Sequence, residues 1–454
     1  MLFDFTLSQV ASLLGLAQPS RDVRCTGIST DTRQIQPGDL YVALRGEHFN
    51  GNDFAAPALA AGAVAVLLDE VPGVEPDGPM LVCDDALLAY GLIAGWQRDA
   101  FAGPIVAITG SAGKTTTKQL MAKVLEQQFT TWMTPGNLNN HIGVPKTLLA
   151  LQSEHEAAVV ELGASGPGEI RYTACLVKPV VGIITNASAA HLEGFGSLAG
   201  VVQTKGELID CVDAEGIVVL NADDPAFDQW RARAGHKQVI TFGLSATADL
   251  YAEDLQARVD GSDFTVCCRG QSWSQPVQLA FPGRHNIANA LAVFAAALGL
   301  GMSPAIVAKG LEAAAPVAGR MKTLVGEGGA RIIDDSYNAN PASIRAAIDV
   351  ISLAPCAWLV LGDMAELGEG AEQAHSDMGR YAKQQGVSAL VATGPLSRAT
   401  VTAFGEQGYW LPDRDAVVAF IKQKMPDQAT ILIKGSRSAG MDQVVRALQL
   451  HSGE

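Results

Sequence analysis

Long apolar runs are absent from this sequence. No stretch approaches the ~18 consecutive apolar residues that a membrane-spanning helix requires, so we expect no membrane span. The opening residues, MLFDFTLSQVASLLGL, contain an acid at Asp4 and no basic leader, which argues against a secretory signal. Thr6 and Gln9 instead have the spacing of a capping box, which predicts a short amphipathic helix that ends near Gly15.

Cysteine is scarce and scattered. The chain has seven cysteines, an odd number, and no CxxC pair, and Cys267 and Cys268 are neighbours on one expected strand. This pattern predicts neither a disulfide framework nor a zinc site, and it is typical of a reducing compartment. We therefore expect a cytoplasmic protein.

Positive charge is in deficit. The chain has 32 Lys and Arg against 47 Asp and Glu, which gives a formal net charge of −15. Binding to nucleic acid requires a basic face, so nucleic acid is excluded as a partner. The 48% hydrophobic and 17% charged content is that of an ordinary folded protein. At ~150 residues per domain, a chain of this length predicts about three domains.

One stretch carries the clearest chemistry. An apolar, mostly β-branched run, Ile105–Ile108, is followed by a glycine loop and then by a helix-forming segment, which is the setting of a phosphate-binding loop. The loop lacks one glycine of the common pattern, because Ile108 stands in its place. We expect these residues to bind ATP: Thr109, Gly110, Ser111, Ala112, Gly113, Lys114, Thr115 and Thr116.

The residue types of this loop explain the expectation. Gly110 and Gly113 lack Cβ atoms, so backbone N–H groups can close on phosphate oxygens. Lys114 would reach the terminal phosphates, and the hydroxyl of Thr115 or Thr116 would bind Mg²⁺. The alternative is a plain strand–turn–helix whose lysine is solvated.

Residues 1–86 are predicted to form a small α/β module. Its expected elements are a strand at Leu40–Leu44, a helix at Ala55–Gly62 and a strand at Ala63–Leu68. Hydroxyls, arginines and a glycine in its loops could hold an anionic group such as a diphosphate, although turn chemistry explains them equally well. These candidate residues are Ser29, Thr30, Arg33, Arg45 and Gly46.

Residues 87–316 and 317–454 each alternate strands with helices. This alternation predicts a central P-loop domain with a parallel sheet, and a smaller C-terminal domain that is Rossmann-like and doubly wound. Residues 250–279 read as a hairpin-like excursion before a helix at Asn286–Leu298. The other expected strands are Thr130–Thr134, Ala157–Leu162, Val180–Asn186, Gly216–Leu220, Val239–Phe242, Arg331–Asp334, Trp358–Leu361, Ala389–Ala392 and Thr430–Ile433.

Ligands of such sheets bind at the carboxyl ends of the strands. Glu161 closes the buried-looking strand AAVVE, where an oxygen ligand for Mg²⁺ is expected in an NTPase. The alternative is a carboxylate that simply reaches solvent. His191 and Lys205, taken alone, read as an ordinary loop histidine and a solvated helix lysine.

The wider pattern resembles the Mur ligases, the ATP-dependent enzymes that add amino acids to the UDP-N-acetylmuramoyl peptide precursor of the bacterial cell wall. The resemblance is greatest to the members that add D-alanyl-D-alanine to UDP-N-acetylmuramoyl-tripeptide in peptidoglycan synthesis. The matching segments run in order over essentially the whole chain: STDTR, PGDLYVALRG, ITGSAGKTT, GNLNNHIGVP, VVELGAS, NASAAHLEGFGSLAGV, TKGE, PGRHNIANALA, DDSYNANPAS, LGDMAELG and KGSRSAGM.

The resemblance implies ATP and two Mg²⁺ ions at the site. Lys114 would bind the β- and γ-phosphates, and Thr115 would bind the first Mg²⁺. Glu161 and His191 would serve the metal pair, and Lys205 would be carried as a carbamate.

It also implies contacts from the outer domains. Asn286 and Asn289 would hold adenine, and Arg320 would reach the ATP phosphates, although the usual Pro-Gly-Arg reads Ala318-Gly319-Arg320 here. The N-terminal module would bind UDP. The remaining implied contacts are Asn140 near the reacting phosphate, Asp335 near the ribose, and Asn338, Asn340 and Lys434 toward the incoming dipeptide.

The implied reaction is amide formation through an acyl phosphate. We expect the enzyme to be a monomer. ATP phosphorylates the carboxylate of the tripeptide, the dipeptide amine attacks, and phosphate leaves. Both steps bring anions together, so metal ions, Lys114 and Arg320 are needed to offset repulsion. The intermediate hydrolyses in water, which predicts that the third domain closes over the site.

Other interpretations stay open at this point. Folylpolyglutamate synthetase resembles the same two later domains but should lack the STDTR…LYVALRG module. The ligase that adds diaminopimelate carries an Asp-Asn-Pro-Arg string, which this chain lacks. A P-loop ATPase that drives a partner belongs to a different class, as does an inactive UDP-peptide-binding module, which the presence of Lys114, Glu161, His191 and Lys205 disfavours.

Overall fold

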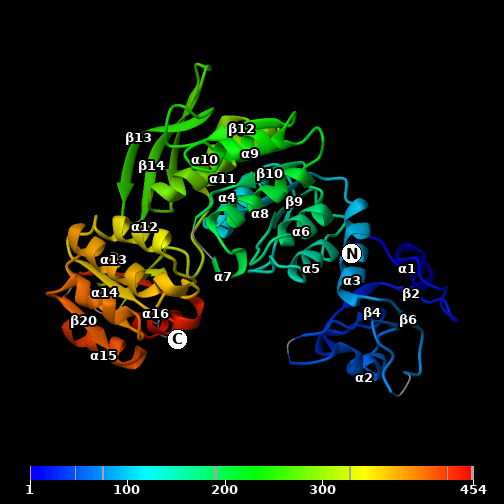
Figure 1. Cartoon of the computed structure of the whole chain (residues 1–454). Coiled ribbons are helices and arrows are strands. Elements are labelled where there is room, and N and C mark those ends of the chain that lie inside the picture. The colour runs from blue at the N-terminus through cyan, green and yellow to red at the C-terminus, as the bar shows by residue number, and fades with distance from the viewer. Residues whose placement is uncertain are drawn as a thin grey trace.

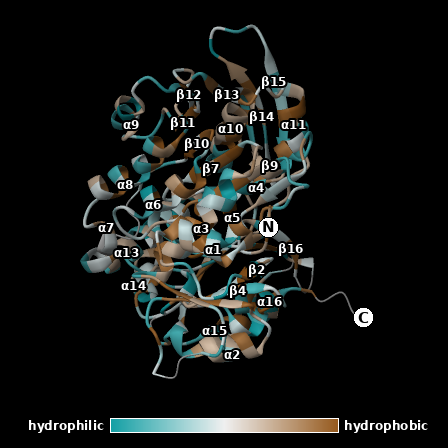
Figure 2. Ribbon diagram, turned by 90° about the vertical axis from the view of Figure 1, so that its right-hand side faces the viewer, coloured by the Kyte–Doolittle hydropathy of each residue, from teal (hydrophilic) through white to brown (hydrophobic). Residues whose placement is uncertain are grey.

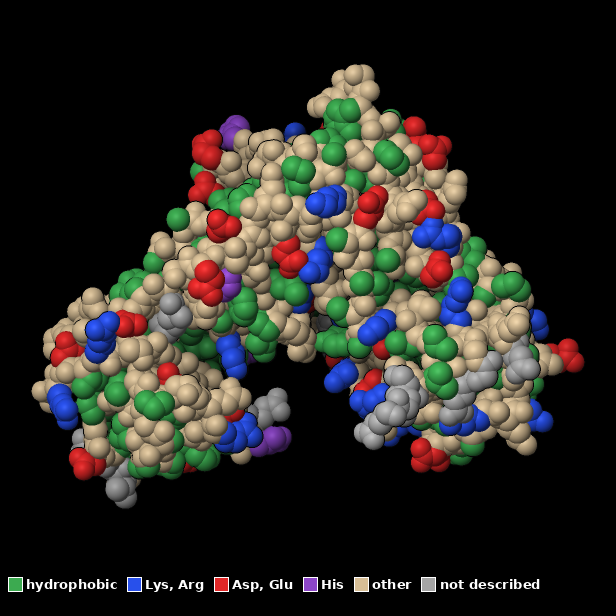
Figure 3. All heavy atoms as spheres, turned by 180° about the vertical axis from the view of Figure 1, so that it is seen from behind, with side chains coloured by type: hydrophobic (Ala, Val, Ile, Leu, Met, Phe, Trp, Pro, Cys, Tyr) green, Lys and Arg blue, Asp and Glu red, His purple; other side chains and the backbone are tan. Residues whose placement is uncertain are grey.

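The computed structural model describes residues 2–46, 48–73, 76–188, 192–326, 329–426 and 428–450. Figure 1 shows three α/β domains, with the N- and C-terminal domains on opposite sides of the central one. Seen from behind, the molecule is an arch whose two outer lobes stand apart beneath the central domain (Figure 3). The predicted three-domain α/β architecture is confirmed, while the predicted boundaries between the domains stay a prediction.

The N-terminal domain has a four-stranded parallel sheet in the order β3-β4-β5-β6. The capping box expected at Thr6 and Gln9 is present and begins α1, which ends at Gly15. The elements are β1 (Phe5–Thr6), α1 (Leu7–Leu14), β2 (Arg24–Cys25), β3 (Gly27–Ser29), β4 (Asp39–Val42), α2 (Ala55–Ala60), β5 (Ala65–Leu68), β6 (Met80–Val82) and α3 (Ala86–Asp99).

The central domain is built on nine strands in the order β15-β14-β13-β12-β11-β10-β7-β9-β8. The run from β8 to β13 is parallel, and β14 and β15 continue the same sheet antiparallel. Its strands are β7 (Ile105–Thr109), β8 (Thr131–Met133), β9 (Ala157–Glu161), β10 (Val181–Ile184), β11 (Ile217–Asn221), β12 (Gln238–Phe242), β13 (Leu250–Arg258), β14 (Gly261–Cys268) and β15 (Ser274–Leu279).

Helices cover both faces of this sheet. Alternate residues of β7 point to opposite faces, so Ile105 and Ala107 join one core while Val106 and Ile108 join the other. Figure 2 shows the hydrophobic character of the strands between these layers. The helices are α4 (Lys114–Leu125), α5 (Gly143–Leu149), α6 (Glu169–Val177), α7 (Leu192–Phe195), α8 (Leu198–Cys211), α9 (Phe227–Ala234), α10 (Arg284–Gly299) and α11 (Pro304–Glu312).

The C-terminal domain has a six-stranded sheet in the order β16-β17-β21-β18-β19-β20, parallel except for β16. Separate cores on its two faces make it doubly wound, as predicted. Its elements are β16 (Lys322–Val325), β17 (Arg331–Asp335), α12 (Pro341–Ile351), β18 (Ala357–Leu361), α13 (Ala371–Gln384), β19 (Ala389–Thr393), α14 (Ser397–Phe404), β20 (Gly408–Leu411), α15 (Arg414–Lys424), β21 (Thr430–Lys434) and α16 (Asp442–Leu448).

The hairpin-like β expected over residues 250–279 is present as β13, β14 and β15, and β13 joins it to the main sheet by pairing with β12. The expectation of no disulfide is wrong, because Cys175 of α6 and Cys211 of α8 are bonded, with Cα atoms 5.0 Å apart. They are separated by 36 residues in sequence, and helix packing brings them together. Within the described residues, no helix combines the length and the apolar character that crossing a membrane requires.

Candidate active site

The glycine loop joins β7 to α4, as its sequence predicts, and its two glycines are required by close contacts. Gly110 has a φ of +150°, and a Cβ there would lie 1.9 Å from Thr185 Oγ1. Gly113 has a φ of +83°, and a Cβ would lie 2.4 Å from Asn289 Oδ1. Larger residues at either position would displace the loop from the strand or from the helix α10.

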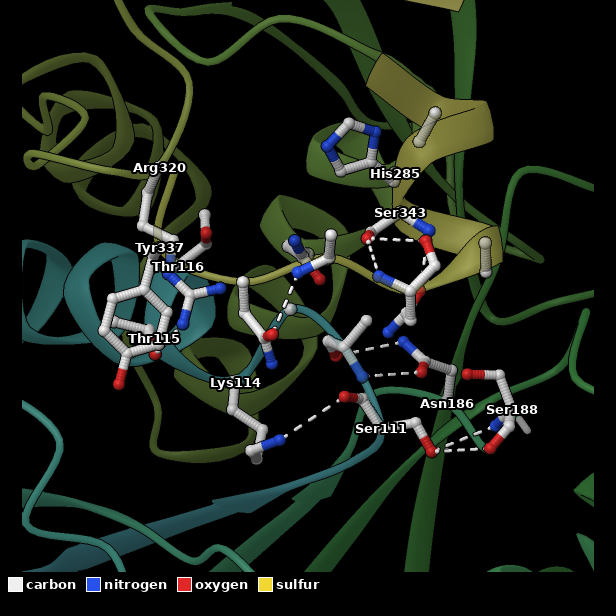
Figure 4. A pocket seen from close by; sticks show the side chains of 18 of the residues that line it. Ser111, Lys114, Thr115, Thr116, Asn186, Ser188, His285, Arg320, Tyr337 and Ser343 are labelled. Atoms are coloured by element: carbon white, nitrogen blue, oxygen red, sulfur yellow. Dashed lines mark hydrogen bonds between the residues drawn. The ribbon is translucent and has the colours of Figure 1, made fainter. Parts of the chain in front are cut away.

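The end of β10 braces the loop from beside it. Asn186 Oδ1 accepts a hydrogen bond from the Ala112 amide at 3.0 Å, and Thr185 Oγ1 donates to the Ala112 carbonyl at 2.6 Å. The Ser111 hydroxyl accepts from the Ser188 amide at 3.0 Å (Figure 4). These contacts with the segment after β10 fix the shape of the loop.

Lys114 is folded back over this loop. Its ammonium donates to the Gly110 carbonyl at 2.7 Å (Figure 4). Withdrawal from solvent lowers the pKa of Lys114 below its usual value; Glu161 opposes this shift and Arg320 adds to it. An anion with several charges is the ligand that such a cation, set among backbone amides at a helix N-terminus, favours.

Glu161, at the end of β9, is 1% exposed and is held from two sides. Its Oε1 accepts hydrogen bonds from Asn139 Nδ2 at 2.7 Å and from Thr115 Oγ1 at 3.3 Å. The Lys118 ammonium lies 3.2 Å from Oε2, close enough for an ion pair. Oε2 nevertheless accepts no hydrogen bond from the described residues, so this buried oxygen keeps unfilled acceptor capacity.

The side-chain oxygen atoms of Glu161 and Thr115 are suitable ligands for a magnesium ion. Mg²⁺ prefers oxygen ligands and is commonly bound through one or two carboxylates together with substrate phosphates and water. The Glu161 carboxylate and the Thr115 hydroxyl lie within hydrogen-bond distance of each other beside the phosphate loop. Within the described ranges, no group of three or more His, Cys, Asp or Glu side chains is placed to hold a metal ion, and His191 lies outside the described residues.

Lys205, on α8, is 2% exposed, which excludes the solvated-lysine alternative. Its ammonium lies 5.2 Å from the centre of the Phe195 ring. Burial and, to a lesser extent, the neighbouring charge of Lys114 lower the pKa of Lys205 to about 7, against the opposing effect of Glu169 and Glu207. The surroundings of this amine thus favour its neutral form more than water does.

A cavity of about 520 Å³ extends from the phosphate loop to the C-terminal domain; we call it the nucleotide cavity. It brings together most of the predicted site residues of these two domains. The side chains of Asn286 and Asn289 are joined by a hydrogen bond of 3.1 Å. The lining includes the residues from Ser111 to Thr116 with Asn140, Glu161, His285, Asn286, Asn289, Arg320, Asp335, Asn338, Asn340 and Lys434.

Four of the predicted residues on the C-terminal side, Asp335, Asn338, Asn340 and Lys434, already have internal partners. Lys434, 3% exposed, pairs with Asp335 at 2.6 Å and donates to the Asn338 carbonyl at 2.9 Å. The Asn340 side chain caps the N-terminus of α12. These contacts fix the loop after β17, so at least part of the role of these residues is structural.

A second cavity, of about 650 Å³, shares Thr115, Arg320 and Tyr337 with the first. Arg320 reaches from the C-terminal domain and donates to Thr115 Oγ1 at 3.4 Å, and its guanidinium lies 4.1 Å from the centre of the Tyr337 ring. Figure 4 shows these three side chains together at the edge of the nucleotide cavity. The second cavity is lined by Thr115, Lys118, Gln119, Glu126, Thr131 to Asn137, Val317, Ala318, Arg320, Tyr337 and Arg437.

The predicted residues of the N-terminal domain line neither cavity. They lie where β3 and β4 end, at one edge of the parallel sheet. The Ser29 hydroxyl donates to the Asp31 carbonyl, and Thr30 lies between these two residues. Arg33 pairs with the Asp31 carboxylate at 2.7 Å, which holds the pKa of that carboxyl down at about 2.

Arg45 is also held by acids, at 2.9 Å from Asp69 and 2.8 Å from Glu70. The ring of Phe49 packs over Gly46, the next residue along the chain. Both arginines of the predicted diphosphate site are thus neutralised by carboxylates. The site stays a prediction.

Sequence reasoning missed several residues at the cavities, among them Lys118, Tyr337 and Arg437. Lys118 follows Lys114 by four residues, a spacing that places both on one face of α4. That spacing was the available signal for Lys118. Tyr337 and Arg437 lie in the segments after β17 and β21. Polar residues at these strand ends indicated that the segments could bind a ligand, but they did not indicate which residue would do so.

Comparison with known proteins adds independent findings. Family models described as Mur ligase middle domain, as Mur ligase, glutamate ligase domain, and as Mur ligase family, catalytic domain, match residues 108–297, 319–437 and 24–88. The chain is 41% identical over 452 residues to the UDP-N-acetylmuramoyl-tripeptide–D-alanyl-D-alanine ligase of Escherichia coli (strain K12), with 99% of both chains covered. It is 34% identical to the enzyme of the same name from Haemophilus influenzae, covering 97% of this chain and 96% of the other.

Solved structures give the same picture. The chain superposes on crystal structure I of MurF from Acinetobacter baumannii with a TM-score of 0.90 and 32% identity, covering 98% of each chain. It superposes on the MurF ligase of Thermotoga maritima, determined in complex with ADP, with a TM-score of 0.84 and 25% identity, covering 93% of this chain and 96% of the other.

Proposed function

The chain belongs to the Mur ligase family, and we propose that it joins D-alanyl-D-alanine to UDP-N-acetylmuramoyl-tripeptide, forming ADP and phosphate from ATP in the cytoplasm. One structural observation carries the proposal beyond family membership: two cavities meet at Thr115 and Arg320. A ligase of this kind needs a nucleotide and an acceptor on either side of the reacting carboxylate. A P-loop ATPase without an acceptor needs only the first cavity.

ATP is assigned to the nucleotide cavity. The amides of the glycine loop and Lys114 bind the β- and γ-phosphates, and Arg320 reaches them from the C-terminal domain. Asn286 and Asn289, buried at the start of α10, hold the adenine end, and Asp335 lies toward the ribose. Gly113 lies against Asn289, so the adenine-binding helix packs directly on the phosphate loop.

Thr115 and Glu161 would hold one Mg²⁺, and His191 with Lys205 would serve a second. When bound, Mg²⁺ neutralises phosphate charge and aligns the attacking and leaving oxygens. Asn139 orients Glu161 through its hydrogen bond of 2.7 Å, and Asn140 lies beside it near the reacting phosphate. The site has few carboxylates, so a carbamate on Lys205 would supply a negatively charged oxygen ligand that the metal ions otherwise lack.

Lys205 is suited to carbamate formation by its surroundings. It is buried beside Phe195, and the positive charge of Lys114 disfavours a second ammonium there. A neutral amine adds to CO₂ and releases one proton, which leaves a carbamate with one negative charge. The product places oxygen ligands at the end of a long side chain on the metal side of the site.

The reaction then follows from these positions. A carboxylate oxygen of the tripeptide attacks the γ-phosphorus, ADP leaves, and an acyl phosphate forms. The amine of the dipeptide attacks the acyl carbon, the resulting tetrahedral intermediate expels phosphate, and the amide nitrogen loses a proton. Lys114 and Arg320 stabilise the negative charge that the two steps gather, and the C-terminal domain limits access of water.

The UDP end of the substrate is assigned to the N-terminal domain, at the edge where Ser29, Thr30, Arg33, Arg45 and Gly46 lie. Lys146 of α5 contributes to the low pKa of Asp31, so this edge lies toward the central domain. The peptide would pass from there over the start of α5 to Glu161.

Mass analysis of the product tests the proposal. The enzyme is incubated with ATP, UDP-N-acetylmuramoyl-tripeptide and a panel of amino acids and dipeptides. We expect one new product, heavier than the tripeptide substrate by one D-alanyl-D-alanine less one water. Brisk ATP hydrolysis that needs neither substrate, with no new amide, would contradict the proposal and favour an ATPase.

A further inference from the structure

Lys118 is a buried lysine of the catalytic region to which the proposed reaction gives no role. It lies on α4, four residues after Lys114, and is 2% exposed. Lysine is almost never fully buried unless it is paired, because its ammonium group loses hydration. The partners that offset this loss indicate what the charge does.

The ammonium group of Lys118 has two partners, which it contacts in different ways. Its Nζ donates a hydrogen bond to the Gly136 carbonyl at 2.8 Å, in the segment between β8 and α5. Oε2 of Glu161 lies 3.2 Å from the same nitrogen, and this oxygen accepts no hydrogen bond from the described residues. Lys118 is therefore fixed by Gly136, and it acts on Glu161 mainly through its charge.

Glu161 is oriented by neutral groups. Its backbone amide donates to Thr134 Oγ1 at 2.9 Å, and its Oε1 accepts from Asn139 Nδ2 at 2.7 Å. Thr134 is 1% exposed, so water does not compete for the first of these contacts. The direction of the carboxylate is thus set without Lys118, which leaves charge as the property that Lys118 supplies.

Positive charge gathers around this carboxylate. Arg320 donates to Thr115 Oγ1, which itself donates to Glu161 Oε1. Lys118 lies beside Oε2, and Lys114 lines the same cavity as the carboxylate. A divalent cation that approaches Glu161 without a counter-anion meets these charges where solvent screens them little. The phosphates of a nucleotide would supply the negative charge that offsets this repulsion.

We propose that Lys118 makes the binding of Mg²⁺ at Glu161 depend on bound nucleotide. Its charge neutralises the carboxylate, so that Glu161 holds the ion firmly only together with the nucleotide phosphates. The inference rests on the proposed function and adds the residue that couples the arrival of the metal to that of ATP. Because Lys118 acts through Glu161, it is a positioning residue.

Binding of Mn²⁺ to the nucleotide-free full chain tests this role. Mn²⁺ is used in place of Mg²⁺ because electron paramagnetic resonance distinguishes its free and bound forms. The buffer is held at about pH 8, so that Glu161 stays ionised in the variants that retain it. In Lys118→Met the Kd for Mn²⁺ should be about 10- to 100-fold lower than in the wild type, because a cation beside the carboxylate is removed.

Three further variants assign the effect. Lys118→Arg keeps the positive charge, so its Kd should stay within about threefold of the wild-type value. The double variant Lys118→Met/Glu161→Gln lacks the carboxylate and should lose the added affinity. Lys123→Met is the matched control, because it removes the same charge from α4 at an exposed pair with Glu126 and should leave Mn²⁺ binding unchanged.

Thermal unfolding of the wild type gives a test that does not require a variant to fold. Mn²⁺ and ADP together should raise the thermal midpoint by more than the sum of the two shifts that each produces alone. A shift with Mn²⁺ alone that equals the shift with both ligands would overturn the inference.

The Mn²⁺ titrations have separate outcomes. Tighter binding in Lys118→Met, absent from Lys118→Arg and from the double variant, supports the inference. Equal affinity in the wild type and in folded Lys118→Met overturns it, as does equal tightening in Lys123→Met. Absence of enzyme-bound Mn²⁺ in the wild type even with ADP would overturn the metal site of the proposed function, and the inference with it.

Discussion

The arginines at the two ends of this molecule differ in whether a carboxylate already neutralises them. In the N-terminal domain, Arg33 and Arg45 are held by acidic neighbours at 2.7 to 2.9 Å. Between the central and C-terminal domains, Arg320 and Arg437 stack on Tyr337 and have no acidic partner among the described residues. Ligands can reach the arginines of both regions. Only Arg320 and Arg437 offer positive charge that no carboxylate neutralises.

The difference separates two ways of binding an anion. A reaction that brings ATP and a carboxylate together needs unpaired cations, because the charges must be offset while bonds change. A site that only anchors a diphosphate can rely on hydroxyls and backbone groups, and acids near its arginines limit how strongly any anion is attracted. We therefore expect substitutions at the interdomain cations to reduce rates strongly, and those in the N-terminal domain to alter binding modestly.

The largest effect is expected at Lys114. Lys114→Ala removes the cation that the glycine loop holds at 2.7 Å, and the rate of phosphoryl transfer should fall by about 10³ or more. The thermal midpoint should change little, since the lysine supports charge rather than core. Wild-type turnover in a folded Lys114→Ala protein would show that the reaction does not depend on the positive charge of Lys114.

The next effect is expected at Lys205. Lys205→Arg keeps a positive charge but cannot form the carbamate, and activity should fall on the order of 100-fold. Lys205→Ala should lose activity as well and regain part of it when acetate is added. Activity assays with and without acetate measure this, with Lys123→Arg on the exposed face of α4 as control. An active Lys205→Arg enzyme would remove Lys205 from the site.

A third substitution tests a compensated cation inside the catalytic region. Lys118 is 2% exposed and pairs with Glu161 at 3.2 Å, so Lys118→Met leaves a buried carboxylate without its partner. The free energy of unfolding should fall by about 3–5 kcal/mol. Lys123→Met breaks only the exposed pair with Glu126 and should cost less than about 1 kcal/mol. Urea unfolding measures both variants. Equal losses of unfolding free energy in Lys118→Met and Lys123→Met would contradict a stabilising buried pair between Lys118 and Glu161.

The smallest effect is expected in the N-terminal domain. Arg45→Met removes an arginine that two acids already neutralise, so the KM for UDP-N-acetylmuramoyl-tripeptide should rise less than about tenfold, with kcat unchanged. Steady-state kinetics with varied tripeptide measure this. A rise of 100-fold or more would show that ligand binding releases Arg45 from its acids, and the contrast between the two ends would not hold.

Most residues predicted for the nucleotide side line one cavity, and they could be predicted because their sequence signals are local. A strand, a glycine loop and a helix are read from one continuous segment, and Glu161 ends a strand whose apolar residues are contiguous. The three-domain α/β architecture followed from the alternation of elements, since that alternation admits few arrangements. Lys205 was predicted as a site residue through its TKGE setting, whereas its burial depends on how α8 packs.

Other features depend on packing between distant segments, which spacing does not reveal. Lys118 is one of several lysines on α4, and only the arrival of β9 and of the loop at Gly136 buries it. The short strands β16 and β20 lack a strong apolar pattern and are defined by pairing at the sheet edges. Cys175 and Cys211 are brought together by the packing of α6 against α8.

Thr115 and Arg320 belong to the walls of both cavities, which constrains how inhibitor resistance could arise. Under the proposed assignment, a compound that spans the shared wall would contact residues of both the ATP site and the acceptor site. A substitution there that weakened the compound would also weaken a substrate. A compound confined to the apolar end, against Met133 and Val317, would meet residues whose replacement harms the enzyme less. The shared wall is therefore the better target for a durable antibacterial compound.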